Sequence, residues 1–190
     1  MRPSTHWHTT LHHGALATVL AVLFWAASPV GIALGAEDAS GPIIGMAIAG
    51  ELDGGSQGFV SGELYLRVSL PWHSHWGRWA ITSQAQLGIA GMRVKDDSSS
   101  LLAAGPLLVM TSPTGRWYGE IGSRAALLTE LSLGDVDLGY PLEFISHGEA
   151  GFILSNRARL GFRIQHISNG GLGDRNPGLN LFSMQLQIHP

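Results

Sequence analysis

The feature that most constrains the fold is a repeated alternation of apolar and polar residues whose polar side carries charge. In residues 60–70 the valine and leucine side chains fall on even positions, while the odd positions include Glu63 and Arg67. Side chains point alternately to the two faces of a strand, so a period of two predicts a strand rather than a helix. Residues 60–70 are therefore predicted to form a long strand with one apolar and one charged face.

Comparable segments recur along the chain, separated by turn-forming clusters such as ELDGGSQG, TSPTG and SNGGLGDRNPG. Eight strands are predicted, over residues 43–50, 60–70, 79–89, 101–111, 117–127, 138–144, 157–168 and 180–188. Glycine, proline, asparagine and aspartate favour tight turns between such segments. The pattern predicts an all-β fold in which consecutive strands are joined by turns.

The charges on the polar faces of the predicted strands help to decide between two kinds of barrel. These are a soluble lipocalin-like barrel and a small outer-membrane barrel. Arginine and glutamate can pair inside a polar lumen, which leaves the apolar rows to face lipid. The expected lumen charges are Glu63, Arg67, Glu120, Arg124, Glu143, Arg159 and Arg163. The tryptophans near turns, suited to an aromatic girdle, are Trp72, Trp76, Trp79 and Trp117. We predict an eight-stranded antiparallel up-and-down transmembrane β-barrel, with a soluble barrel as the alternative.

The start of the chain has the composition of a signal peptide. Arg2 gives a positive start, residues 15–27 form an apolar core, and ALGAED supplies small residues for cleavage near Ala36. The stretch is also long enough for a membrane anchor, although proline and glycine interrupt it. We divide the chain into a signal peptide, residues 1–36, and an outer-membrane β-barrel domain, residues 37–190.

The composition excludes several kinds of function. The formal net charge of -3 gives no basic footprint for nucleic acid, and the absence of cysteine removes thiolate metal sites and cysteine nucleophiles. His73, His75 and His147 could in principle supply three metal ligands, but no pattern of carboxylates supports such a site. Solvated histidines in turns are the simpler interpretation. No metal or cofactor is expected.

The residues with candidate chemistry lie in the last two predicted strands. In residues 157–168, His166 and Ser168 continue the apolar face, and the same face of residues 180–188 leads back to Asn180. Hairpin pairing would bring the three polar side chains together on the outer wall. A barrel with an even number of strands keeps both termini in the periplasm, which places this group at the external rim.

These three side chains suit nucleophilic catalysis. A serine hydroxyl is a weak nucleophile until a base takes its proton, and an imidazole can do so once a third group fixes its tautomer. Residues i and i+2 of a strand lie roughly 6–7 Å apart at Cα, so His166 and Ser168 must lean together to meet. Asn180 could orient the imidazole through its amide oxygen, as in Cys-His-Asn sites, but an amide cannot offset the imidazolium charge.

The stretch FRIQHISNGGLGDRNPGLN, residues 162–180, resembles the active-site hairpin of the PagL-type lipid A 3-O-deacylases, outer-membrane β-barrels with a H-x-S-N motif followed by N-x-G and the third triad residue. The resemblance implies Ser168 as nucleophile, His166 as general base and then general acid, and Asn169 as an oxyanion-hole donor. The third triad residue, a glutamate in the best-known member, falls on Asn180. The implied reaction is hydrolysis of the 3-O-linked acyl chain of lipid A, without metal or cofactor.

The resemblance also implies a substrate path and partners. The apolar groove for the acyl chain would be formed by Phe162, Ile164, Phe182 and Met184. Arg175 would meet a lipid phosphate. The partners would be lipopolysaccharide and the outer membrane of a Gram-negative bacterium, with no nucleic acid, and the sequence leaves open a homodimer. The alternative is a noncatalytic barrel, structural or lipopolysaccharide-binding, because Asn180 departs from the expected acid.

Overall fold

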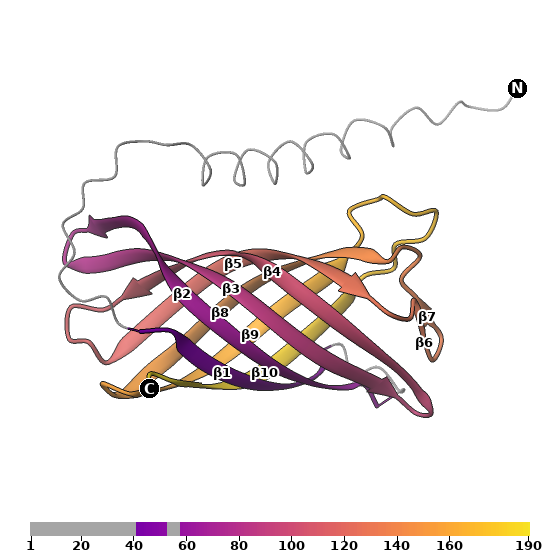
Figure 1. Cartoon of the computed structure of the whole chain (residues 1–190), viewed down its shortest axis with the longest axis horizontal. Helices are drawn as coiled ribbons and strands as arrows, with labels where there is room; N and C mark the ends of the chain where they lie inside the picture. Colours follow the sequence, from indigo (N-terminus) through magenta and orange to yellow (C-terminus); the bar gives the residue numbers. More distant parts are fainter. Residues whose placement is uncertain (1–40, 53–57) are drawn as a thin grey trace, which may run out of the picture.

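The computed structural model describes residues 41–52 and 58–190, so the predicted signal peptide and the alternative membrane anchor lie outside the described residues. Eight of the strands form a closed antiparallel barrel (Figure 1). They are β1 (Ile43–Glu51), β2 (Val60–Trp76), β3 (Trp79–Val94), β4 (Asp97–Thr111), β5 (Trp117–Leu128), β8 (Leu142–Ser155), β9 (Ala158–Ser168) and β10 (Leu179–Ile188). A separate small hairpin of β6 (Ser132–Leu133) and β7 (Val136–Asp137) lies between β5 and β8. Within the described residues, no helix has the length and apolar character needed to cross a bilayer.

The first and last strands close the barrel. β1 pairs with β10 from Ile44 opposite Ile188 to Glu51 opposite Leu181, and β2 pairs with β1 on its other side. Closure leaves no unpaired strand edge, as a sheet in lipid requires. Figure 1 shows β1 beginning close to the C-terminus at one end, with the β6–β7 hairpin at the opposite end. We call the end that carries the start of β1 and the C-terminus periplasmic and the other end external.

The sixth strand of the barrel differs from the prediction. The strand predicted over residues 138–144 was expected to be followed by a turn-forming cluster, GEAGFILSN (residues 148–156), but β8 runs from Leu142 to Ser155. Glycines in this segment serve packing across the lumen rather than a turn: a Cβ atom on Gly151 would lie 2.6 Å from the ring of Tyr118. Leu138, expected on the lipid-facing row of this strand, precedes β8 and is only 1% exposed.

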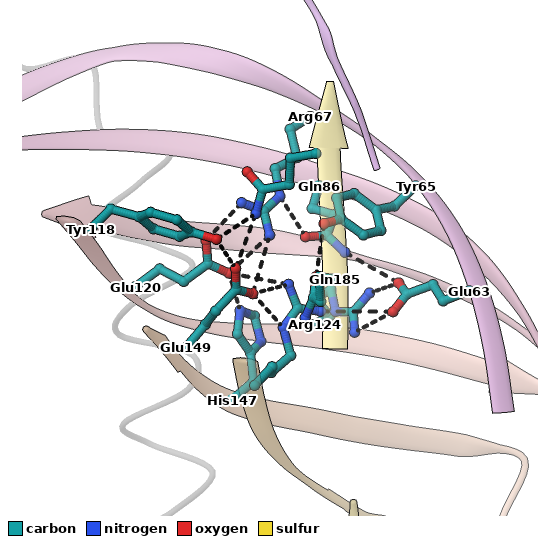
Figure 2. Close-up of polar contacts among 12 residues, drawn as sticks. Glu63, Tyr65, Arg67, Gln86, Tyr118, Glu120, Arg124, His147, Glu149 and Gln185 are labelled. Atoms are coloured by element: carbon teal, nitrogen blue, oxygen red, sulfur yellow. Dashed lines mark hydrogen bonds and ion pairs between the residues drawn. The ribbon is translucent and has the colours of Figure 1, made fainter. Parts of the chain in front are cut away.

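The lumen is filled by a network of buried ion pairs (Figure 2). Arg67 binds both oxygens of Glu120, at 2.7 and 2.8 Å. Arg163 reaches Glu149 at 2.9 Å and Glu120 at 3.1 Å. Arg124 pairs with Glu63, so these arginines and glutamates balance in charge. The predicted salt-bridged lumen is confirmed for these residues, and the pairing makes burial of their charges tolerable. Glu143, also predicted for the lumen, is fully buried, but neither of its carboxylate oxygens has a hydrogen bond among the described residues.

The outer wall is apolar over most of its height. Exposed apolar side chains occur on every barrel strand, including Ile48, Leu64, Ile89, Leu102, Ile121, Leu154, Ile164 and Met184. Trp76 and Trp117, 71% and 52% exposed, lie at the periplasmic ends of their strands, where an aromatic girdle is expected. A polar lumen inside an apolar wall is the arrangement of a membrane barrel, so the soluble-barrel alternative is wrong.

An apolar cluster closes the external end of the lumen. Leu133 of β6 and Leu138 pack against residues of the barrel wall such as Ile145, Ile167 and Leu179. The segment between β5 and β8 is thereby held over the end of the barrel, beside the loop that joins β9 to β10.

Candidate active site

His166 and Asn180 are cross-strand neighbours. The register of β9 and β10 places them directly opposite one another, and Nδ1 of His166 lies 2.8 Å from Oδ1 of Asn180. An amide oxygen only accepts hydrogen bonds, so Nδ1 carries the proton and donates it. In the neutral ring this leaves the lone pair on Nε2, which is the tautomer that a general base needs.

The lack of a side chain at Gly178 leaves room for the imidazole ring. A Cβ atom on Gly178 would lie 2.7 Å from Cε1 and 3.4 Å from Nε2 of His166. Leu179 is opposite Ile167, so Gly178 lies level with Ser168. The Cε1–Nε2 edge of His166 therefore faces Gly178, which is level with Ser168.

Ser168 is the last residue of β9 and is half-buried. Its parity places it on the same outward face as His166. No side-chain hydrogen bond of Ser168 occurs among the described residues, so the predicted contact with His166 is not made in this conformation. Catalytic hydrogen bonds are often long before substrate binds, and rotation of the two side chains toward each other is the motion that contact requires.

Asn169 is fully buried and holds the loop that follows β9. Its amide nitrogen donates to the carbonyl oxygens of Leu138, at 2.8 Å, and Arg175, at 2.6 Å. Its amide oxygen accepts from the backbone of Gly171 at 2.8 Å, and its own backbone N–H donates to Oδ1 of Asn176 at 3.1 Å. All N–H groups of Asn169 thus have acceptors, which sequence reasoning did not anticipate.

Arg175 belongs to the contact between the two external loops. Its guanidinium pairs with Asp137 at 2.8 Å, while its side chain remains 72% exposed. The backbone beneath this pair is close-packed, because a Cβ atom on Gly139 would collide with the carbonyl of Arg175. Arg175 is therefore held at the surface with most of its side chain accessible.

The expected groove residues form one apolar patch on the periplasmic side of His166. Phe182 is opposite Ile164, and Met184 is opposite Phe162. The rings of Phe162 and Phe182 are stacked, with centroids 6.2 Å apart. All four side chains are exposed on the outer wall.

Two neighbours of the site on β8 were missed by sequence reasoning. Phe144 is opposite Ser168, and Ser146 is opposite His166. The alternation in residues 142–152 contains this information, but the strand was predicted to stop at Phe144.

Neither a carboxylate partner for His166 nor a cluster of metal ligands is found at the site within the described residues. Among the residues that the structure describes, no carboxylate forms an ion pair with His166, and no group of three or more histidine or acidic side chains could hold a metal ion. His73 and His75 are exposed near the periplasmic end of β2, whereas His147 lies in the lumen, 3.4 Å from Glu120.

Comparison with known proteins gives consistent matches. The family described as lipid A 3-O-deacylase (PagL) matches residues 60–189. The lipid A deacylase PagL of Bordetella bronchiseptica is 28% identical over 145 residues, covering 68% of this chain and 82% of that protein.

Solved structures share the fold. The crystal structure of the outer membrane enzyme PagL has a TM-score of 0.68 at 21% identity and covers 77% of this chain and 98% of that one. Neisserial surface protein A (NspA) has a TM-score of 0.52 at 13% identity and covers 81% and 100% of the two chains. At these identities the structural likeness establishes the fold.

Proposed function

The chain belongs to the lipid A 3-O-deacylase (PagL) family, and we propose that it is an outer-membrane carboxylic ester hydrolase that removes the 3-O-linked acyl chain from lipid A. The observation that carries the proposal is the hydrogen bond from Nδ1 of His166 to Asn180. This bond leaves Nε2 as the basic atom. Nε2 lies on the ring edge that faces Gly178, and Gly178 is level with Ser168 on the neighbouring strand. A Ser/His pair on a lipid-facing wall suits an ester that arrives within the leaflet.

The reaction proceeds in two halves. Nε2 of His166 takes the proton of the Ser168 hydroxyl as Oγ attacks the ester carbonyl, giving a tetrahedral oxyanion. Collapse breaks the bond to the sugar oxygen, which receives the proton from His166, and the acyl group stays on Ser168. A water molecule, deprotonated by His166, then attacks the acyl-serine ester. The fatty acid leaves and Ser168 recovers its proton.

Asn169 is proposed to stabilise the oxyanion through its backbone N–H. The N–H of the residue after a nucleophilic serine is a recurrent oxyanion donor. Here that N–H binds the side chain of Asn176, which is exposed and can rotate away. The amide group of Asn169 keeps its buried bonds to the loops and so holds this backbone donor in place.

The outer wall and its rim offer contacts for the parts of lipid A that surround the ester. The acyl chain would lie along Phe162, Ile164, Phe182 and Met184, which continue the wall from the site toward the membrane centre. Arg175 would meet a phosphate of lipid A with the N–H groups that Asp137 does not occupy. The site would thus open to the outer leaflet of a Gram-negative outer membrane.

Asn180 supports a competing interpretation, in which the barrel is noncatalytic and is structural or binds lipopolysaccharide. Replacing the carboxylate of a serine-protease triad by an amide lowers the rate about ten-thousand-fold, largely through the wrong tautomer. Here Oδ1 of Asn180 faces Nδ1 of His166, which favours the tautomer that a general base needs, so the proposed defect is limited to the absent negative charge. We therefore propose a slower hydrolase rather than an inactive relative.

Mass spectra of lipid A test the proposal. Cells expressing the chain should contain lipid A lacking one 3-O-acyl group, and cells expressing Ser168→Ala at the same level should not. Identical spectra would overturn the hydrolase and favour the noncatalytic barrel. The homodimer left open by the sequence gains no support from the described residues, and the proposed chemistry requires one chain only.

A further inference from the structure

Two serines on the outer wall stand in line with the site and have no part in the proposed mechanism. Ser123 of β5 is opposite Ser146 of β8, Ser146 is opposite His166, and His166 is opposite Asn180. All four side chains have the outward parity of their strands. They form one polar row across four adjacent strands.

The two serines of the row are unusual because the wall on both sides of them is apolar. On its external side the wall continues with Ala125 and Phe144, and on its periplasmic side with Ile121, Gly148 and Ile164. Neither serine hydroxyl has a hydrogen bond among the described residues. A hydroxyl that faces hydrocarbon without a partner costs free energy, so a partner from the lipid would be favourable.

The row descends from the rim into the wall. Asn180 is next to the external end of β10 and His166 is near that of β9, whereas Ser146 and Ser123 lie progressively further from the external ends of β8 and β5. A group bound along this row would therefore be embedded among acyl chains rather than in the sugar region.

The strand pairing beside Ser123 is interrupted. The ladder between β4 and β5 pairs Ala104 with Ala125 and resumes only at Leu107 and Gly122. Pro106, which lies between, has no N–H to donate. The break in the ladder coincides with the inner end of the polar row.

We propose that Ser146, supported by Ser123, is a hydrogen-bonding subsite for an oxygen in the acyl region of the substrate, close to the scissile ester. This inference rests on the proposed function. Ser146 is opposite His166 and is the diagonal cross-strand neighbour of Ser168. Diagonal neighbours lie roughly 7–8 Å apart, so an oxygen a few bonds from the carbonyl that Ser168 attacks is within reach of Ser146. A hydroxyl can donate to a carbonyl or exchange hydrogen bonds with another hydroxyl.

Two parts of one lipid could supply this oxygen. The first is a hydroxyl group on the acyl chain that is removed. The second is the carbonyl of a neighbouring acyl linkage on the same sugar. Either would make the enzyme select lipids by the polarity of their acyl region, which the apolar patch of Phe162, Ile164, Phe182 and Met184 cannot do.

The test measures binding, so that it does not depend on turnover. Full-length protein carrying Ser168→Ala is purified in detergent, and lipid binding is followed by native mass spectrometry. Three probes are compared: a glucosamine 1-phosphate with acyl chains on its 2-amino and 3-hydroxyl groups and a hydroxyl on the 3-O-chain, the same lipid without the chain hydroxyl, and the same lipid without the 2-N-acyl group. Ser146→Ala is added, with Ser100→Ala as the control, since Ser100 is also an exposed outward serine but on β4.

Ser146→Ala should weaken binding of the complete probe about threefold to tenfold, the value of one hydrogen bond. Ser146→Ala should leave unchanged the binding of the probe that lacks the oxygen bound by Ser146. The unaffected probe thus identifies whether the chain hydroxyl or the 2-N-acyl carbonyl supplies that oxygen. Equal effects on all probes, no effect, an equal effect of Ser100→Ala, or no binding would overturn the subsite. Selective binding by a wild type that releases no acyl chain would instead overturn the proposed hydrolysis and leave the subsite standing.

Discussion

Asn180 accepts a hydrogen bond from Nδ1 of His166 at 2.8 Å, across the last pair of barrel strands. In a serine triad this position is taken by a carboxylate, which orients the imidazole and stabilises the imidazolium that forms during attack. The amide retains the first function and lacks the second. The contact that orients the imidazole is thus present, without the charge that a carboxylate would add.

Restoring the charge should accelerate hydrolysis. Asn180→Asp keeps an oxygen acceptor on β10 and adds a negative charge beside the developing imidazolium, so we expect acyl release to rise about tenfold or more. Initial rates on purified lipid A provide the measurement. Asn156→Asp adds the same charge in the turn between β8 and β9 and should leave the rate unchanged. A rate for Asn180→Asp at or below that of the wild type would contradict this role of Asn180.

A side chain at Gly178 should displace the base. Gly178 has a φ of 72°, and a Cβ atom there would lie 2.7 Å from the ring of His166. We expect Gly178→Ala to lower kcat at least about tenfold, because a displacement of about 1 Å can cost a hundredfold in rate. Gly77→Ala is the matched control, since Gly77 has a φ of 60° and nothing within 4 Å of its Cβ position. Equal activities of the two folded variants would contradict the proposed positioning of His166.

The sequence was sufficient to predict the barrel because the signals are local. Alternation gives the face of each residue, and charges such as Glu63, Arg67 and Arg163 on one face indicate a polar lumen. The same parity placed His166 and Asn180 side by side, and the structure confirms that they are neighbours. These inferences needed only the period of a strand and hairpin pairing.

The parts that sequence reasoning missed depend on contacts between distant segments. Leu138 looks like a strand residue, but it is buried because its loop packs into the lumen end against residues such as Leu179. Asn169 looks like a free donor beside Ser168, but its partners are backbone oxygens of Leu138 and Arg175. No periodicity reports such bonds, because they are set by the meeting of two irregular loops.

Removing the donors of Asn169 should separate these loops. Asn169→Asp keeps the shape of the side chain but cannot donate to the carbonyls of Leu138 and Arg175. We expect faster proteolysis within residues 129–141 and 169–178, together with loss of hydrolysis, while the barrel stays folded. Asn176→Asp is the control for proteolysis because a carboxylate can still accept from the backbone of Asn169. Equal cleavage rates in the wild type and Asn169→Asp would contradict this structural role.

The lumen network should determine stability without determining the chemistry of the site. Arg163 is fully buried and reaches Glu149 at 2.9 Å and Glu120 at 3.1 Å, so Arg163→Met leaves buried carboxylates with too little positive charge. Removing one partner of a buried ion pair typically costs about 3–5 kcal/mol. We expect the free energy of unfolding to fall by about this amount, measured by urea unfolding from lipid vesicles. Arg157→Met removes an exposed charge that has no ion pair within the described residues and should change it little. Activity per folded molecule should survive Arg163→Met, because Arg163 points into the lumen whereas His166 lies on the outer face of the same strand. Equal unfolding free energies for the two variants would show that the network is dispensable.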